Sequence, residues 1–306
     1  MKVTASAPGK VILFGEHAVV YGEPAIAGAI DKRIYATAAK RNDDVINVSS
    51  SHELRDGYPY VKAASKLVFE YLGKSCGADI MIKAEFPPAS GLGSSAAVSV
   101  ATIKALLALL GEDVSKKDIA ILGHKVEKNV QGSASITDAS VTTFGGMLFI
   151  KPKLEVVEEL EVGEIPLVVG YTGQSGSTKM MVEKVRALKE EHPDIVDSII
   201  HNIGRVTLEA KTALIRGDYI GGLMDINNGL LEALGVGTKK LSTYIYAARG
   251  AGAKGAKITG AGGGGCMVAY APDKQEKVAG AIKGRGGTPL IVSIESQGVR
   301  LEKTNK

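Results

Sequence analysis

The chain has 306 residues, 45% of them hydrophobic and 23% charged, and this balance excludes a mainly disordered protein. Its formal net charge is +4 and its aromatic content 5%, so it lacks the basic surface and stacking residues that nucleic-acid binding requires. We find no apolar run long enough to cross a membrane, no leader-type start and only two distant cysteines, so we expect a soluble, cytoplasmic protein without a disulfide framework.

The first half of the chain is predicted to mix strands and helices. The opening residues alternate like strand on both sides of a break at Pro8-Gly9, and Ser115 with Asp118 forms a capping-box start for a helix. We predict strands over 3–5, 11–14, 25–39 and 79–86, and helices over 60–72, 94–110 and 115–130.

The second half repeats this mixture with longer helices. We predict helices over 179–191, 194–216, 219–234, 241–249 and 275–282, and strands over 145–150, 166–171, 256–259, 266–270 and 289–294. The mixture is α+β, and the length favours two domains, which we place at 1–165 and 166–306.

The strongest local signal is Pro-Pro-Ala-Ser-Gly-Leu-Gly-Ser-Ser-Ala-Ala over residues 87–97, between a predicted strand and a predicted helix. Its glycines permit close backbone approach, and a helix N-terminus supplies free N–H groups, so the segment can cradle phosphates. Ser94 and Ser95 would place hydroxyls in the first turn, where one could bind Mg²⁺. An ordinary glycine turn with serine caps is the alternative.

A second glycine-rich segment, Lys-Ile-Thr-Gly-Ala-Gly-Gly-Gly-Gly-Cys, covers residues 257–266. It satisfies the dinucleotide pattern G-x-G-x-x-G, but a strand follows where that motif needs a helix. We predict instead a hairpin whose loop backbone passes close to a ligand or to a packed neighbour. So many glycines lose conformational entropy without adding core, which favours the ligand.

Five polar residues form the remaining candidates. Lys10, Glu16 and His17 surround a short apolar strand near the start, and Glu127 and Asp138 lie on either side of a segment of small residues. We expect that segment to be a loop that could bring Asp138 close to a ligand. Taken alone, each residue could equally be a solvated side chain, a turn histidine or a helix cap.

Together, segments 7–22, 88–97 and 257–266 resemble, in this order, the three motifs of the GHMP small-molecule kinases, which act on galactose, homoserine, mevalonate and phosphomevalonate. The resemblance spans most of the chain. Segment 9–22 is most similar to the members that phosphorylate mevalonate, and the length fits their compact archaeal form. One departure is that residues 131–138 carry serine, isoleucine and threonine where relatives often have proline, glycine and valine.

The resemblance implies phosphoryl transfer from ATP, with Mg²⁺, to the primary hydroxyl of mevalonate. Asp138 would accept the hydroxyl proton, and Lys10 would keep it ionised and stabilise the transferring group. Ser95 and Glu127 would hold the metal. The expected ATP contacts are Pro88, Ala89, Ser90, Gly91, Leu92, Gly93, Ser94, Ser95, Ala96 and Ala97, and the expected substrate contacts are Glu16, His17, Thr178 and Gly262.

The implied fold has an N-terminal α/β domain with a left-handed crossover and a C-terminal α+β domain, with the active site between them and a homodimer as the assembly. Another substrate of the same family, homoserine or phosphomevalonate, is the main alternative. A dinucleotide-dependent oxidoreductase fits segment 91–96, but the acidic residue that it needs falls at a helix end, at Glu112 or Asp113. A non-catalytic ligand sensor is the third alternative, although Lys10, Glu127 and Asp138 are all present.

Overall fold

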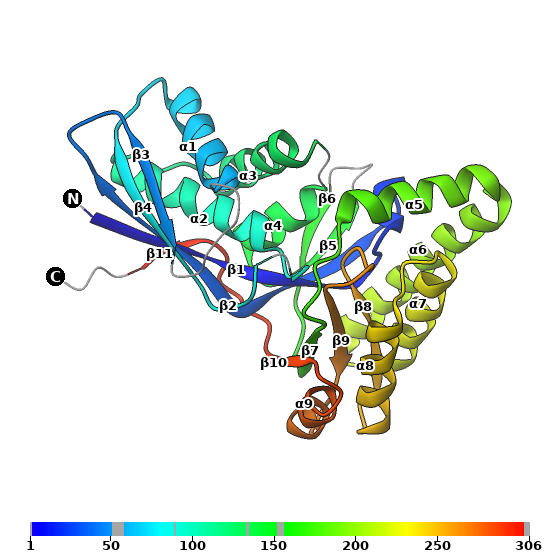
Figure 1. Ribbon diagram of the computed structural model, residues 1–306. Coiled ribbons are helices and arrows are strands. Elements are labelled where there is room, and N and C mark those ends of the chain that lie inside the picture. Colours follow the sequence, from blue (N-terminus) through cyan, green and yellow to red (C-terminus); the bar gives the residue numbers. More distant parts are fainter. Residues whose placement is uncertain (1, 51–57, 89, 133–134, 152–155, 303–306) are drawn as a thin grey trace.

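The computed structural model describes residues 2–50, 58–88, 90–132, 135–151 and 156–302, and Figure 1 shows them arranged as two β-sheets with covering helices. The larger sheet has the strand order β11-β1-β2-β4-β3, and β5 pairs with both β2 and β6. Its strands are β1 (Lys2–Phe14), β2 (Ala25–Lys40), β3 (Ile46–Ser50), β4 (Ala78–Ala84), β5 (Met147–Lys151), β6 (Val156–Leu160) and β11 (Arg300–Leu301).

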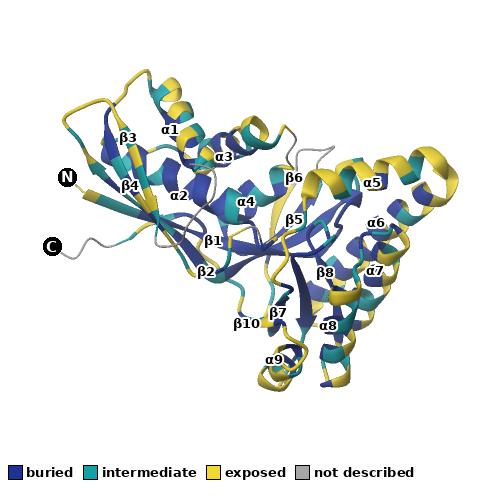
Figure 2. Cartoon of the chain, in the orientation of Figure 1, coloured by how far each residue is buried: buried dark blue, intermediate teal, exposed yellow. Residues whose placement is uncertain are grey.

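Four helices accompany this sheet: α1 (Pro59–Leu72), α2 (Ser94–Leu109), α3 (Lys116–Gln131) and α4 (Ile136–Phe144). Helix α2 packs against β1 and β2 and carries apolar or small side chains on nearly every side, as a helix inside a core does. Figure 2 shows α2 and the neighbouring part of β1 largely buried. The sheet and α2 therefore make a rigid base for residues at the helix N-terminus.

The smaller sheet is antiparallel, in the order β10-β7-β9-β8. Its strands are β7 (Leu167–Tyr171), β8 (Gly255–Thr259), β9 (Cys266–Tyr270) and β10 (Thr288–Val292), and its helices are α5 (Thr178–Glu191), α6 (Pro193–Arg216), α7 (Gly221–Ala233), α8 (Lys239–Gly250) and α9 (Gln275–Lys283). All five helices and four strands were predicted within a few residues. The predicted hairpin around the second glycine-rich segment is confirmed as β8 and β9.

Two sequence predictions about the first half of the chain were wrong. The two short strands expected before residue 15 are one continuous strand, β1, which runs through Pro8 with a register shift between Pro8 and Gly9, the kind of irregularity at which a strand tolerates proline. Asp138 does not lie in a loop but in the first turn of α4, whose N-cap is Ser135. Small and β-branched residues hide that helix, because their intrinsic helix propensity is low and tertiary packing decides their conformation.

Strands β3 and β4 form a parallel pair, with α1 in the connection between them. The left-handedness expected for the crossover stays a prediction. In the described part of the chain, no helix combines the length and the apolar character needed to span a bilayer.

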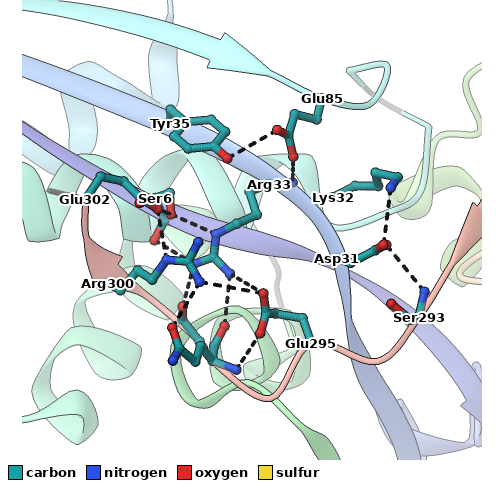
Figure 3. Close-up of polar contacts among 12 residues, drawn as sticks. Ser6, Asp31, Lys32, Arg33, Tyr35, Glu85, Ser293, Glu295, Arg300 and Glu302 are labelled. Carbon is teal, nitrogen blue, oxygen red and sulfur yellow. Dashed lines mark hydrogen bonds and ion pairs between the residues drawn. The ribbon is translucent and has the colours of Figure 1, made fainter. Parts of the chain in front are cut away.

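The C-terminal segment returns to the larger sheet, where the buried Arg33 of β2 holds it in place (Figure 3). The Arg33 guanidinium donates to the carbonyl oxygens of Gln297 and Gly298 at 3.0 and 2.6 Å, and to Ser6 Oγ at 2.7 Å. It also pairs with Glu295 at 3.3 Å. One residue further on, the Val299 N–H donates to the Thr143 carbonyl at the end of α4, so the segment supports that helix.

We predict that Arg33→Met lowers the free energy of unfolding by about 3 kcal/mol, because it leaves several buried acceptors without a donor. For a chain of this length the melting temperature should fall by roughly 5 °C, measured by calorimetry. Arg300→Met is the control, since that side chain lies in the same cluster but is 36% exposed, and its loss should cost under about 1 kcal/mol. Equal melting of the Arg33→Met variant and the unmodified protein would contradict the prediction.

Candidate active site

A pocket of about 660 Å³ lies where residues of the two sheets meet. We call the polar part of its lining, formed by Lys10, Ser95, Glu127 and Asp138, its centre. One end is lined from β2, β3, β4 and α1, and the other from the turn after β1, from α5 and from the β8–β9 loop, since α1 and α5 lie on opposite sides of the molecule in Figure 1. The lining residues of the first end include Ile34, Ser50, Tyr58, Val61, Ile82 and Ala84, and those of the second include His17, Val19, Thr178, Val182, Gly260 and Ala261.

The first glycine-rich segment forms a loop that ends at the N-terminus of α2, as predicted. Gly91 and Gly93 have φ values of +86° and +73°, which favour glycine strongly. A Cβ atom at Gly93 would lie only 2.6 Å from Cγ of Lys10. The backbone N–H of Lys10 donates to the Leu92 carbonyl at 2.9 Å, so β1 and this loop are held together. The expected ATP contact Ala89 lies outside the described residues.

The two candidate catalytic residues are in contact. Nζ of Lys10 lies 3.2 Å from Oδ2 of Asp138 and donates to the Gly91 carbonyl at 3.3 Å. The Lys10 side chain is 4% exposed and that of Asp138 is 27% exposed. The carboxylate can therefore meet a ligand in the pocket, while the ammonium lies below it in a poorly solvated position where its charge acts strongly.

The carboxylate of Glu127, on α3, faces the same centre from a buried position. Its Oε1 accepts a hydrogen bond of 2.8 Å from Ser95 Oγ, whereas Oε2 has no partner among the described residues. Burial, followed by the nearby charge of Asp138, raises the pKa of Glu127 to about 8. A carboxylate and a hydroxyl are suitable ligands for Mg²⁺, and the orphaned Oε2 fits a bound cation.

The described residues contain no cluster of three or more His, Cys, Asp or Glu side chains arranged for a metal ion. A cation held by Ser95 and Glu127 would therefore need further oxygen ligands from water or from a phosphate. This is the usual situation for Mg²⁺, which keeps several waters and is often held partly by substrate phosphates.

The expected substrate contacts are placed unevenly. His17 and Thr178 line the pocket, and Nε2 of His17 lies 2.9 Å from the Ala261 carbonyl oxygen. In the β8–β9 loop, Gly260 and Ala261 line the pocket, whereas a Cβ at Gly262 would lie 2.3 Å from the Val236 carbonyl oxygen. Gly262 thus fits the packing alternative that the sequence left open.

Glu16 borders the pocket, but its carboxylate is engaged elsewhere. Its Oε1 contacts Nζ of Lys257 in β8, and its Oε2 accepts from Nδ2 of Asn227 on α7 at 3.1 Å. The sequence analysis did not single out Lys257 or Asn227. The available signal was a lysine within the strand Gly255–Thr259, every residue of which is buried. A charged side chain at such a position requires a buried partner.

Comparison with known proteins decides the family. The family model described as the GHMP kinases N terminal domain matches residues 59–146, and that described as GHMP kinases C terminal matches residues 210–287. The mevalonate kinases of Thermococcus sibiricus and Pyrococcus abyssi are each 46% identical to the chain, with 99% of this chain and 99% of the relative covered. The chain belongs to the GHMP kinase family.

The solved structures agree with this assignment. A crystal structure of the L. major mevalonate kinase in complex with R-mevalonate matches this GHMP kinase with a TM-score of 0.86 and 27% identity, covering 96% of this chain and 95% of the other. The two-domain GHMP kinase fold expected from the sequence is therefore confirmed. As a kinase of this family the protein uses ATP, and the oxidoreductase and sensor alternatives are set aside.

The raised pKa of Glu127 makes a prediction about stability. In the unfolded kinase this carboxyl titrates near 4.5, so without metal the folded state loses stability as the pH rises from about 4.5 to about 8. Glu127→Gln removes that penalty. We expect the variant to gain on the order of 4 kcal/mol relative to the unmodified kinase between pH 5 and pH 8.

Urea unfolding at several pH values in the presence of a chelator measures this difference. Glu183→Gln, at an exposed position of α5, controls for the loss of a carboxylate and should show no comparable trend. A difference between Glu127→Gln and the unmodified kinase that does not change with pH would contradict the assignment.

Proposed function

We propose that the protein transfers the γ-phosphoryl group of ATP to the primary hydroxyl of mevalonate. The observation that carries the proposal is the contact between Lys10 and Asp138 directly below the glycine loop. The mevalonate kinase names of relatives 46% identical over the full length support the choice of substrate. The bound R-mevalonate of the L. major structure supports it as well.

The reaction requires one proton acceptor and the stabilisation of charge on the transferring group. Asp138 accepts the proton of the mevalonate hydroxyl as its oxygen forms a bond to the γ-phosphorus. The bond from that phosphorus to the bridging oxygen of ATP breaks, and ADP leaves with the electron pair. Lys10 stabilises the phosphoryl oxygens and holds the Asp138 carboxylate by a charge-assisted contact.

The expected ATP contacts of segment 88–97 would hold the ATP phosphates, since the N–H groups at the N-terminus of α2 attract anions. Ser95 and Glu127 would hold Mg²⁺, which neutralises phosphate charge when bound. The apolar end of the pocket, with Ile34, Val61 and Ile82, is suited to the nucleoside. The opposite end, with His17 and Thr178, then takes mevalonate.

We also propose the division of the chain at residues 1–165 and 166–306. The change of sheet between β6 and β7 supports it, although β11 returns to the larger sheet. The homodimer and the cytoplasmic location stay predictions.

We expect purified protein with MgATP to phosphorylate mevalonate with a kcat/KM at least tenfold above that for phosphomevalonate, homoserine or galactose. This factor corresponds to about 1.4 kcal/mol of differential transition-state binding. Release of ADP and the mass of the product measure it. Preferred turnover of homoserine or phosphomevalonate would overturn the substrate assignment and leave the kinase assignment intact.

Asp138→Asn should lower kcat by roughly 10² or more, because it removes the proton acceptor at nearly constant shape. Lys10→Met should also lower kcat. The double variant should be little worse than the poorer single variant, since groups that act as a unit show non-additive losses.

Titration with a fluorescent ATP analogue, alongside steady-state rates and circular dichroism, separates catalysis from nucleotide binding and folding. Asp118→Asn, at a half-buried position in the first turn of α3 outside the pocket lining, is the control and should keep its rate. Near-normal kcat of Asp138→Asn, or a loss confined to ATP affinity, would show that Asp138 is not the proton acceptor.

A further inference from the structure

A buried ion pair joins the turn after β1 to β8. Nζ of Lys257 contacts Oε1 of Glu16, and both side chains are 0% exposed. Nζ of Lys257 also donates to the Ile258 carbonyl at 2.6 Å, and Asn227 donates to the second oxygen of Glu16. The catalytic contacts proposed above use none of these three side chains.

Stability alone is a poor explanation for this pair. Burial raises the pKa of Glu16 and lowers that of Lys257, while the contact between them acts in the opposite direction on each. Withdrawing two charges from water is costly, and well-packed apolar residues of similar size are often at least as stabilising. Asn227 adds to the cost, because its Oδ1 is buried without a partner among the described residues.

The turn that carries Glu16 is strained as well. His17, the next residue, has a φ of +60°, a backbone conformation that residues other than glycine rarely adopt. A conformation of this kind persists only where the surroundings fix it, and such conformations cluster at functional sites. Two unfavourable features, buried charge and backbone strain, therefore meet at one turn on the pocket wall.

The end of β1 and the turn that follows it are held to the β8–β9 hairpin at two other places, one on each. Thr259 Oγ1 accepts from the Ile12 N–H at 2.9 Å and donates to the Ile12 carbonyl at 3.0 Å. Beyond it, His17 contacts the Ala261 carbonyl. Glu16 and Lys257 form a third connection, and it is the one adjacent to His17 in sequence. The two pocket-lining residues, His17 and Ala261, thus lie in a turn and a loop that extend from two different sheets, and these contacts hold the two segments together.

We propose that Glu16, Lys257 and Asn227 are positioning residues, which fix His17 and the Ala261 loop at the end of the pocket that takes the phosphoryl acceptor. The inference rests on the proposed function, which places mevalonate at that end. It assigns Glu16 an indirect role in place of the direct substrate contact expected from the sequence. The nucleotide end, formed by other elements, does not depend on the pair.

The double variant Glu16→Gln/Lys257→Met tests the proposal, because it removes both charges, leaves no unpaired ion and nearly keeps the side-chain shapes. We expect the KM for mevalonate to rise at least tenfold, while the dissociation constant of a fluorescent ATP analogue changes less than twofold. A merely structural role would affect both ligands or neither. Circular dichroism and thermal melting check that the variant folds.

The matched control is Asp225→Asn/Arg249→Met. The two side chains lie 2.7 Å apart, and each forms a hydrogen bond to the backbone of Ala256 in β8, one residue from Lys257. Neither residue is among those that line the pocket. The control should leave the KM for mevalonate within twofold of normal. An equal rise in the control would show general loosening of β8 and overturn the proposal, as would an unchanged KM in the Glu16→Gln/Lys257→Met variant.

Should the double variant fail to fold, Asn227→Leu provides the second test. It breaks the Asn227 contact with Glu16 and keeps the Glu16–Lys257 pair, and we expect a threefold or greater rise in the KM for mevalonate with unchanged ATP-analogue binding. An unchanged KM would again overturn the proposal. Failure of the unmodified protein to phosphorylate mevalonate would refute the proposed function instead, so the two failures are distinguishable.

Discussion

The position of Lys10 is the constraint on which the rest of the site depends. Its N–H fixes the glycine loop through Leu92, its ammonium reaches the Gly91 carbonyl, and the same ammonium contacts Asp138. One residue, Lys10, therefore sets the relative positions of strand β1, the glycine loop and helix α4. Its stem also occupies the space where any side chain at residue 93 would begin, which is why the loop needs a glycine there as well as a positive φ.

This arrangement explains why the polar centre of the site is built on β1 and the helices beside the larger sheet and not on a surface loop. Helix α2 is surrounded by core, so its N-terminal N–H groups have a fixed direction. Lys10 lies on a strand paired with β2 along most of its length, so its backbone cannot shift without breaking the sheet. Phosphoryl transfer relies on positioning and electrostatics more than on covalent chemistry, and a rigid base provides both.

The sequence was most informative where the backbone of a short segment needs glycine, because such segments can be recognised from neighbouring residues alone. The glycines of the loop before α2 and of the β8–β9 hairpin indicate positive φ values and close approach of the backbone to neighbouring groups. The loop and the hairpin were both predicted correctly as elements of the fold. The helix that carries Asp138 was missed, because residues such as Thr137 and Val141 favour helix only when packing supplies the free energy. Strand β11 was missed because it has only two residues, and its partner β1 lies almost 300 positions away in the sequence.

Contacts between residues far apart in the sequence were not predicted either, because no local pattern marks them. The partners Glu16 and Lys257 are 241 positions apart, and no periodicity links them. Their types alone offered a clue, since a lysine in an otherwise apolar strand must find an acceptor. The acceptor proved to be a residue that the family resemblance had assigned to the substrate. A motif residue can therefore serve its site through the frame around it as well as by touching the ligand.

The charge of the Glu127 carboxyl depends on its neighbours Asp138 and Lys10 and on any cation bound beside it. With a pKa near 8 the carboxyl is largely protonated at neutral pH in the absence of other ligands. A divalent cation held at Oε2 would favour the ionised form, so metal binding there releases a proton. Asp138 raises the pKa of Glu127, and Lys10 lowers it. The groups proposed to hold metal, proton and phosphoryl charge are thus one electrostatic unit, in which the charge state of each depends on what the others bind.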